Sequence, residues 1–363
     1  MNKAQIPTFK ILPLVQIDNT HNEIDIQSIR ALCSKGLSIN CPPEDRALAW
    51  LNLLSIYPAN PQHWSTVCKA ISKSYHNISI NFSVDQFLDT YKVNDKKLMD
   101  SIKSDIDRSI LQLNYLVNKD GSCCKSEDDE KQLEMHMKRI ERILYVFAKV
   151  NPKFGYIQGF NELLIPIYYV MNSAHMIFFN HIDYIEAFSY EAFQFLLISS
   201  NLVDFFTLTS GSLQNEDKLH KFDELLNHFL PKIYKKLKLL NIESMQYSYK
   251  WFNIMFSQEH SLPQLLPLWD SILAHLDNLT HYEFCIGVAR IRSVQDKLES
   301  NQLDHKHHCK NCNHLGQILS ILCNIETKNV YELIYHANLI FNNKRRLSKS
   351  KFSIHIFKDS AIL

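Results

Sequence analysis

Apolar residues recur every three or four positions over most of this chain, the spacing that gathers them on one face of an α-helix. The clearest stripe lies within residues 127–150, where Leu133, Ile140 and Phe147 follow the helical period. Asn151–Pro152 then ends the helix, because proline disfavours helical backbone in the residue before it. The alternation typical of half-buried strands is scarce. The pattern therefore predicts an all-α fold.

Shorter helices are predicted on both sides of this long one. Ile26, Ile29 and Cys33 mark one face of a helix that Gly36 can close. Pro42–Pro43 opens the next helix. Others are expected after Pro61 and at about 163–171, 184–199, 217–240, 246–257, 263–275, 281–299 and 314–324. There is no fixed repeat, so a solenoid is disfavoured and one irregular multi-helix domain, with two lobes as an option, is expected.

The composition is that of a globular chain. Its 363 residues are 46% hydrophobic, enough for one large core or two ordinary ones. With 39 Lys+Arg against 38 Asp+Glu, the net charge of +1 provides no overall attraction to nucleic acid or membrane. Nine scattered cysteines, no signal-peptide core and no apolar run long enough to span a bilayer lead us to expect a cytoplasmic protein.

Two of the seven glycines, Gly155 and Gly159, bracket a short segment that contains Tyr156 and Gln158. Glycine permits left-handed backbone, so this loop between two apolar helices can hold Gln158 outward in a defined pose. The simpler interpretation is that Gln158 caps the helix beginning near Phe160. The residues alone leave both interpretations open.

Upstream, Ile102, Asp105 and Arg108 follow one another at intervals of three residues. This spacing places an apolar anchor, an acid and a guanidinium along one side of a helix or at its C-terminal exit, where the acid can orient the arginine. An Asp–Arg pair at this spacing is, however, most often an ordinary solvated surface pair. Neither motif is specific alone.

Taken together and in this order, the two motifs resemble those of the TBC domain of Rab GTPase-activating proteins. The arginine motif I-x-x-D-x-x-R appears as IKSDIDR at 102–108, and the glutamine motif Y-x-Q-G-[MF]-N appears as YIQGFN at 156–161. RALAW at 46–50 and the segment 251–272, with its Trp269–Asp270 pair, are similar to further family motifs.

The resemblance covers residues 30–340. It implies an all-α TBC-type domain, preceded by an N-terminal extension at 1–29 and followed by a basic C-terminal tail at 341–363. One departure lies beside the arginine, where Ser109-Ile110-Leu111 stands in place of the family's common Thr-x-Pro.

The resemblance also implies roles for two exposed side chains. Arg108 would act as an arginine finger on a GTP-bound, Rab-type small GTPase, and Gln158 would orient the attacking water. An arginine supplied in trans contributes about 10³–10⁵ in rate to phosphoryl transfer from GTP. The planar guanidinium keeps its charge and can contact two phosphate oxygens at once. The chain would need no cofactor of its own, because the partner carries GTP and Mg²⁺.

Other motif residues would support these two. Asp105 would steer the arginine, Asn161 would brace the glutamine loop, and Tyr156 would pack beside the site, next to Gly159 of the same motif. Arg46 and Trp50 are expected to be structural, with the indole packed between helices and the guanidinium satisfied inside the bundle.

A rival hypothesis is a helical adaptor that binds a GTPase or another protein without accelerating hydrolysis. The retention of both finger residues argues against it. The chain has no G-x-x-x-x-G-K-[ST] loop, so it is not expected to hydrolyse nucleotide by itself. Through a Rab partner, the protein can associate peripherally with endomembranes. Nucleic acid is not expected as a partner.

Two polar segments offer weaker signals. In HKHHCKNCNH at 305–314, Cys309 and Cys312 have zinc-ligand spacing and lie among four histidines. All candidate ligands crowd into ten residues of a polar insert, so a solvated loop is the favoured interpretation and no metal site is predicted. KRRLSKSK at 344–351 can contact anionic lipid, although a solvated tail is the simpler interpretation.

Overall fold

The computed structural model describes residues 23–82, 93–178, 182–199, 202, 214–300 and 310–342. Regular structure in these residues is helical and includes no strand, so the all-α prediction is confirmed. In chain order the helices are α2 (Ile26–Cys33), α3 (Pro43–Leu53), α4 (Trp64–Asn81), α6 (Val93–Arg108), α7 (Ile110–Leu113), α8 (Glu127–Val150), α9 (Phe160–Ser173), α10 (Ile182–Gln194), α12 (Gln214–Phe229), α13 (Pro231–Leu239), α14 (Met245–Asn253), α15 (Leu262–Leu273), α16 (Leu279–Ser293), α17 (Gln295–Glu299), α18 (Lys310–Cys323) and α19 (Val330–Phe341). Short helical turns are η1 (Pro61–His63), η2 (Asn114–Leu116), η3 (His175–Phe178), η4 (Phe195–Ser199), η6 (Ser257–Glu259) and η7 (Leu276–Asn278).

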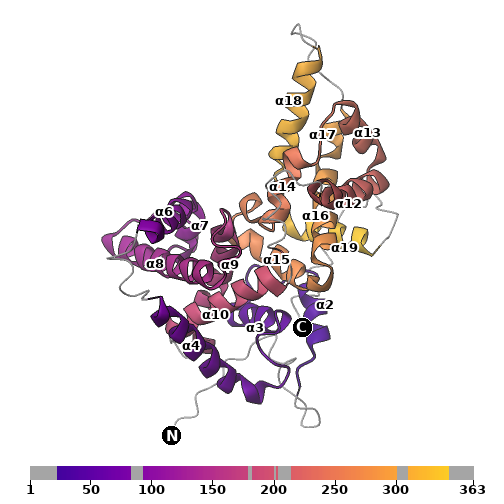
Figure 1. The fold of residues 1–363 in the computed structure, drawn as a ribbon. Coiled ribbons are helices and arrows are strands. Elements are labelled where there is room, and N and C mark those ends of the chain that lie inside the picture. The colour runs from indigo at the N-terminus through magenta and orange to yellow at the C-terminus, as the bar shows by residue number, and fades with distance from the viewer. Residues whose placement is uncertain are drawn as a thin grey trace.

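The helices form two lobes (Figure 1). The first lobe holds α3, α4 and α6 to α10, and the second holds α12 to α14 and α16 to α19. Helix α15 lies between them and packs on α3 and α9 of the first lobe and on α16 and α19 of the second. One continuous hydrophobic core runs through both lobes. The lobes are therefore parts of one packed unit.

Local sequence explains where the long helix α8 starts and stops. Ser126 accepts a hydrogen bond from the backbone N–H of Asp129, and the Asp129 carboxylate accepts from the backbone of Ser126, which is a capping box. The helix ends at Val150, before Pro152, as its sequence predicts. Its buried face packs against α6, α9 and α10.

Three predicted helices differ in detail. The helix expected at 217–240 is two helices, because Pro231 has no N–H to continue the first and begins the second. The helix expected at 281–299 breaks at Val294. The helix expected at 246–257 ends at Asn253, because Met255 and Phe256 adopt left-handed backbone.

The polar segment 305–314 is partly helical, since α18 begins at Lys310. Residues 305–309 of the His/Cys cluster and 343–363 of the basic tail lie outside the described residues. None of the described helices is long and apolar enough to cross a membrane. The segment 163–171 instead forms most of the buried helix α9.

A buried carboxylate joins the central helix α15 to α3 and to the loop after α2. Asp270 on α15 has no solvent exposure, and its Oδ1 accepts hydrogen bonds from Arg46 Nε at 3.1 Å and Trp50 Nε1 at 2.7 Å. Its Oδ2 accepts from the backbone N–H of Leu37 at 3.0 Å. Burial raises the pKa of Asp270, and the nearby Arg46 guanidinium opposes that shift. The donors take the place of the water that the carboxylate has lost.

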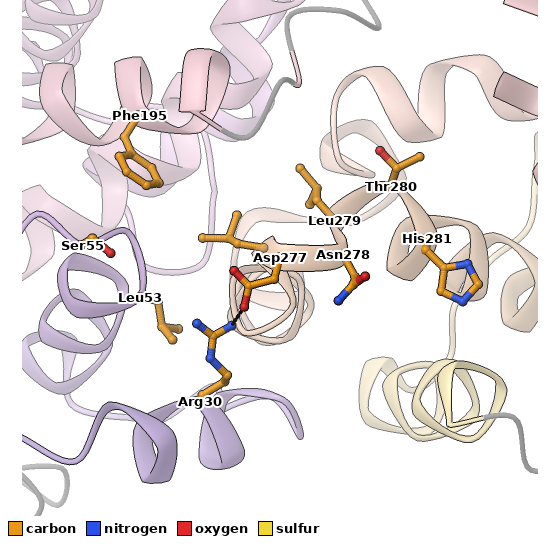
Figure 2. Close-up of a pocket in the computed structure, with 10 residues that line it drawn as sticks. Arg30, Leu53, Ser55, Phe195, Asp277, Asn278, Leu279, Thr280 and His281 are labelled. Carbon is orange, nitrogen blue, oxygen red and sulfur yellow. Dashed lines mark ion pairs between the residues drawn. The ribbon is translucent and has the colours of Figure 1, made fainter.

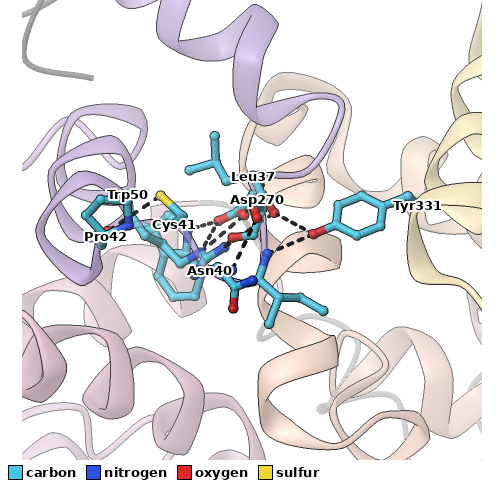
Figure 3. A network of polar contacts seen from close by, with 10 residues as sticks. Leu37, Asn40, Cys41, Pro42, Trp50, Asp270 and Tyr331 are labelled. Carbon is cyan, nitrogen blue, oxygen red and sulfur yellow. Dashed lines mark hydrogen bonds and ion pairs between the residues drawn. The ribbon is translucent and has the colours of Figure 1, made fainter. Parts of the chain in front are cut away.

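The same network reaches α19 through Tyr331 (Figure 3). The Tyr331 hydroxyl donates to the Leu37 carbonyl at 3.1 Å and accepts from the Ile39 N–H at 2.8 Å. Arg46 donates to the Ser38 carbonyl at 2.8 Å. The loop after α2 is thus tied to α3, α15 and α19.

Asp270→Ala is expected to destabilise the protein by about 3–5 kcal/mol, because it leaves the buried Arg46 without its counter-charge. The matched control is Asp277→Ala. Asp277 pairs with Arg30 at 3.2 Å, but its side chain is 78% exposed, so its loss should cost about 0–1 kcal/mol. Urea denaturation of both variants measures the difference. Equal losses of unfolding free energy in the two variants would show that the buried network contributes no more stability than an exposed ion pair.

His136 is a buried histidine on α8. Its Nδ1 lies 2.8 Å from the Tyr168 hydroxyl. Burial and, to a smaller degree, the nearby Arg139 lower its pKa to about 4. The imidazole is therefore neutral in the folded protein at neutral pH.

His136 makes stability depend on pH in a direction that follows from its lowered pKa. The unfolded chain binds a proton at this side chain near pH 6.5 and the folded protein does not, so acidification favours unfolding. Between pH 6.5 and about 4, wild type should lose about 1.4 kcal/mol per pH unit relative to His136→Gln. Denaturation at several pH values, with the exposed His63→Gln as control, measures this slope. If the difference in stability between wild type and His136→Gln does not change with pH, the lowered pKa of His136 is contradicted.

Candidate functional site

The end of helix α6 presents the first of the two predicted fingers. Ile102 is fully buried, and Asp105 is 5% exposed. Arg108 is the last residue of α6, and its side chain is 64% exposed. Arg108 NH1 donates to Asp105 Oδ1 at 2.7 Å. A buried acid thus holds one side of an exposed guanidinium.

The loop before α9 presents the second finger. The N–H of Phe160 donates to the carbonyl of Ile157 at 3.1 Å, which closes a four-residue turn with Gln158 and Gly159 at its centre. Gly159 has φ 103° and ψ −11°, and Gln158 is not among the positive-φ residues. These values correspond to a type II turn, whose third position requires glycine. Gln158 occupies the exposed corner of that turn.

The alternative in which Gln158 caps the helix does not match this geometry. The N-cap of α9 is Gly159, and no side-chain hydrogen bond caps this helix. Glu162 instead donates its N–H to the Gly159 carbonyl at 3.1 Å.

Asp105 connects the two motifs. Its Oδ2 accepts a hydrogen bond from the Tyr156 hydroxyl at 2.8 Å, while its Oδ1 holds Arg108. Burial raises the pKa of the Tyr156 phenol, and the Asp105 charge adds to the shift, so the phenol remains a donor. One carboxylate therefore contacts the arginine finger and a residue two positions before the glutamine.

A second connection runs through the main chain of α6. Asn161 Nδ2 donates to the Asp105 carbonyl at 3.1 Å and to Ser109 Oγ at 2.8 Å. Ser109 Oγ in turn donates to Glu162 Oε1 at 2.9 Å. The first turn of α9 is thereby fastened to the residue that follows Arg108. Ser109, the departure from the family pattern, supplies the hydroxyl that this link needs.

Sequence reasoning missed four residues of this site. Ser109 and Glu162 are buried, and Gln112 and Gln258 extend the network toward the second lobe. Ser109 and Glu162 each directly follow one of the two motifs, and this position could have marked them as site residues. No local pattern could have pointed to the other two, because their partners are distant in sequence.

Arg46 and Trp50 lie elsewhere, in the Asp270 network described above. Their contacts are internal to the helical bundle. The finger site itself contains exposed Arg108 and Gln158 and, within the described part of the chain, no group of three or more possible metal ligands occurs. Such a site can present a cation and an amide to another molecule.

A separate cavity of about 510 Å³ lies between the lobes (Figure 2). The Arg30–Asp277 ion pair, at 3.2 Å, borders it. Its remaining lining comes from Leu53, Ser55, Phe195, Leu276, Asn278, Leu279, Thr280 and His281. None of the finger-site side chains lines this cavity.

Comparison with known families identifies the fold. The family model described as the Rab-GTPase-TBC domain matches residues 45–298. This chain belongs to that family. The packed helices of this TBC domain extend past the matched region, from α2 at one end to α19 at the other.

Relatives and solved structures agree with this assignment. The TBC domain is similar to a TBC domain-containing protein of Schizosaccharomyces pombe, at 33% identity over 40% of this chain and 23% of the relative. It is also similar to human TBC1 domain family member 13, at 29% identity over 46% of this chain and 40% of the relative. The matched segments therefore span less than half the length of these curated relatives.

The solved structures extend the likeness to the fold of nearly the whole chain. The Ypt/Rab-GAP domain of Gyp1p superposes with a TM-score of 0.66 and 16% identity, covering 92% of this chain and 96% of that domain. The Chlamydomonas flagellar RabGAP TBC domain superposes with a TM-score of 0.52 and 13% identity, over 90% of this chain and 87% of that one. At these identities the likeness concerns the fold alone.

The type II turn of the TBC domain can be tested through its glycine. Gly159→Ala is expected to destabilise the protein by about 1–3 kcal/mol, because φ 103° is strained for a residue with a Cβ. Gly316→Ala is the control, since Gly316 lies inside α18 with open space around it and alanine there should stabilise by about 0.5–1 kcal/mol. Thermal denaturation of both variants provides the comparison. If Gly159→Ala stabilises the protein as much as Gly316→Ala does, position 159 does not require left-handed backbone.

Proposed function

We propose that this TBC domain accelerates GTP hydrolysis by a Rab-type small GTPase, with Arg108 and Gln158 both supplied in trans. The partner binds in its GTP-bound state and brings the nucleotide and Mg²⁺. The contact is transient, because turnover requires release after hydrolysis. The chain acts from the cytoplasm, and any association with a vesicle membrane follows from the partner.

The observation that supports this proposal best is the shared use of Asp105. A carboxylate that is 5% exposed directs two different motifs, one ending in an exposed guanidinium and the other in an exposed amide. Burying a carboxylate costs free energy. A buried carboxylate whose side-chain contacts arrange two surface motifs therefore suggests that those motifs have a function. Membership in the Rab-GTPase-TBC family favours a Rab as that target.

The chemistry fits the two side chains. Phosphoryl transfer needs the water positioned and the charge developing on the phosphate oxygens stabilised. Arg108 is not blocked by a bidentate partner, since its one hydrogen bond to Asp105 uses NH1. The Arg108 side chain is 64% exposed, so a partner can reach it. Gln158 carries both a donor and an acceptor, as a group that orients water must.

Single-turnover GTP hydrolysis on a panel of purified, GTP-loaded Rabs tests the proposal. Wild type is expected to accelerate at least one Rab. Arg108→Ala should lose about 10³-fold or more of that rate, and Gln158→Ala about 10²–10³-fold. Arg108→Lys should also lose most of the rate, because an ammonium cannot make the forked contact.

Two surface variants are the matched controls. Lys97→Ala removes one positive charge from an exposed position on the same helix, and Gln62→Ala removes an exposed amide in η1. Both should retain the wild-type rate. If folded wild type binds a Rab without accelerating any member of the panel, the adaptor hypothesis replaces this one.

A further inference from the structure

The chain between α14 and α15 adopts a strained conformation. Met255 has φ 49° and Phe256 has φ 62°, two successive bulky residues in the left-handed region. Both side chains are fully buried. Left-handed backbone is rare for large side chains, and such strain persists only where the surroundings enforce it. It turns the following segment, η6, toward the first lobe, where η6 packs on α9.

Helix α15 and the second lobe hold this segment from one side. Trp269 Nε1 donates to the Met255 carbonyl at 3.0 Å. Glu259 forms ion pairs with Arg290 of α16 and, at 2.9 Å, with Lys250 of α14. Arg290 is 1% exposed, so its pairing with Glu259 is a buried contact.

The finger lobe is attached to the other side of the same segment. Gln112 Nε2 donates to the carbonyl of His260 at 2.9 Å and lies 3.4 Å from that of Ser257. Gln258 Nε2 donates to Glu162 Oε1 at 3.3 Å. We refer to residues 255–260 as the interlobe clamp.

The clamp contacts each finger element four residues beyond the finger itself. Gln112 follows Arg108 by four residues, and Glu162, the partner of Gln258, follows Gln158 by four residues. Glu162 also accepts a hydrogen bond from Ser109, the residue after Arg108, so the two finger elements are joined directly as well. The clamp thus contacts both finger elements through separate hydrogen bonds.

We propose that the interlobe clamp fixes the relative positions of the two fingers, with Gln112 and Gln258 as positioning residues. The inference rests on the proposed function, since it concerns how Arg108 and Gln158 are aligned on one nucleotide. The strained backbone of 255–256 brings the carbonyls of the clamp into reach of Gln112. The second lobe thereby takes part in aligning the two fingers.

The test separates hydrogen bonding from packing. Gln112→Met keeps the size of the side chain but removes its donor, and Gln258→Ala removes the other donor. Gln258→Lys restores a donor for Glu162. With a Rab that responds to wild type, the maximal single-turnover rate should fall about tenfold to a hundredfold in Gln112→Met, and by less in Gln258→Ala. The concentration giving half-maximal acceleration should change less than about threefold, and Gln258→Lys should recover the rate.

Amide hydrogen exchange of the free protein gives a readout that needs no GTPase. Both donor-removing variants should exchange faster at 105–112 and 156–162, whereas Gln62→Met and Gln62→Ala should not. Unchanged exchange, or faster exchange with an unchanged maximal rate, would overturn the role of the clamp. If wild type accelerates no Rab, the proposed function fails and the exchange measurement alone decides whether the clamp orders the loops.

Discussion

The buried charge of Asp270 is the constraint on which the arrangement of helices depends. A carboxylate without solvent exposure must find donors inside the protein, and here it finds them on α3 and in the loop after α2. That loop also contacts α19 through Tyr331. The position of α15 between the lobes is therefore specified by polar contacts as well as by the apolar core around it. Hydrophobic burial alone would leave such a helix freer to rotate.

The finger site repeats this design with exposed ends. Asp105 is buried, yet each of its oxygens contacts a motif that places a long polar side chain in solvent. Asn161 and Ser109 add a second link between the same two elements. The exposed tips were predicted because they belong to motifs that resemble those of a family, as do Asp105 and Asn161. Ser109 and Glu162 lie outside the predicted roles, because a polar residue without such a motif carries no signal of its own.

Much of this fold follows from local sequence. The ends of α8 are marked by Ser126 and Pro152, and Pro231 marks a break that continuous periodicity concealed. Left-handed backbone at Met255 and Phe256 has no local sequence cause, because tertiary packing imposes it. The motifs predicted which residues would face a partner. They could not reveal that Trp269–Asp270 receives Arg46, or that Gln112 reaches His260, since those contacts join distant parts of the chain.

The type II turn around Gln158 also bears on the thermodynamics of encounter. Its backbone is closed by a hydrogen bond, and its flank is tied to Asp105 before any partner arrives. The conformational entropy of this loop is thus lost during folding instead of during association. The arginine side chain, exposed and held at one end, keeps more of its rotamer freedom until contact. In the proposed complex, the backbone around the glutamine would meet the GTPase already ordered, whereas the guanidinium would become ordered on contact.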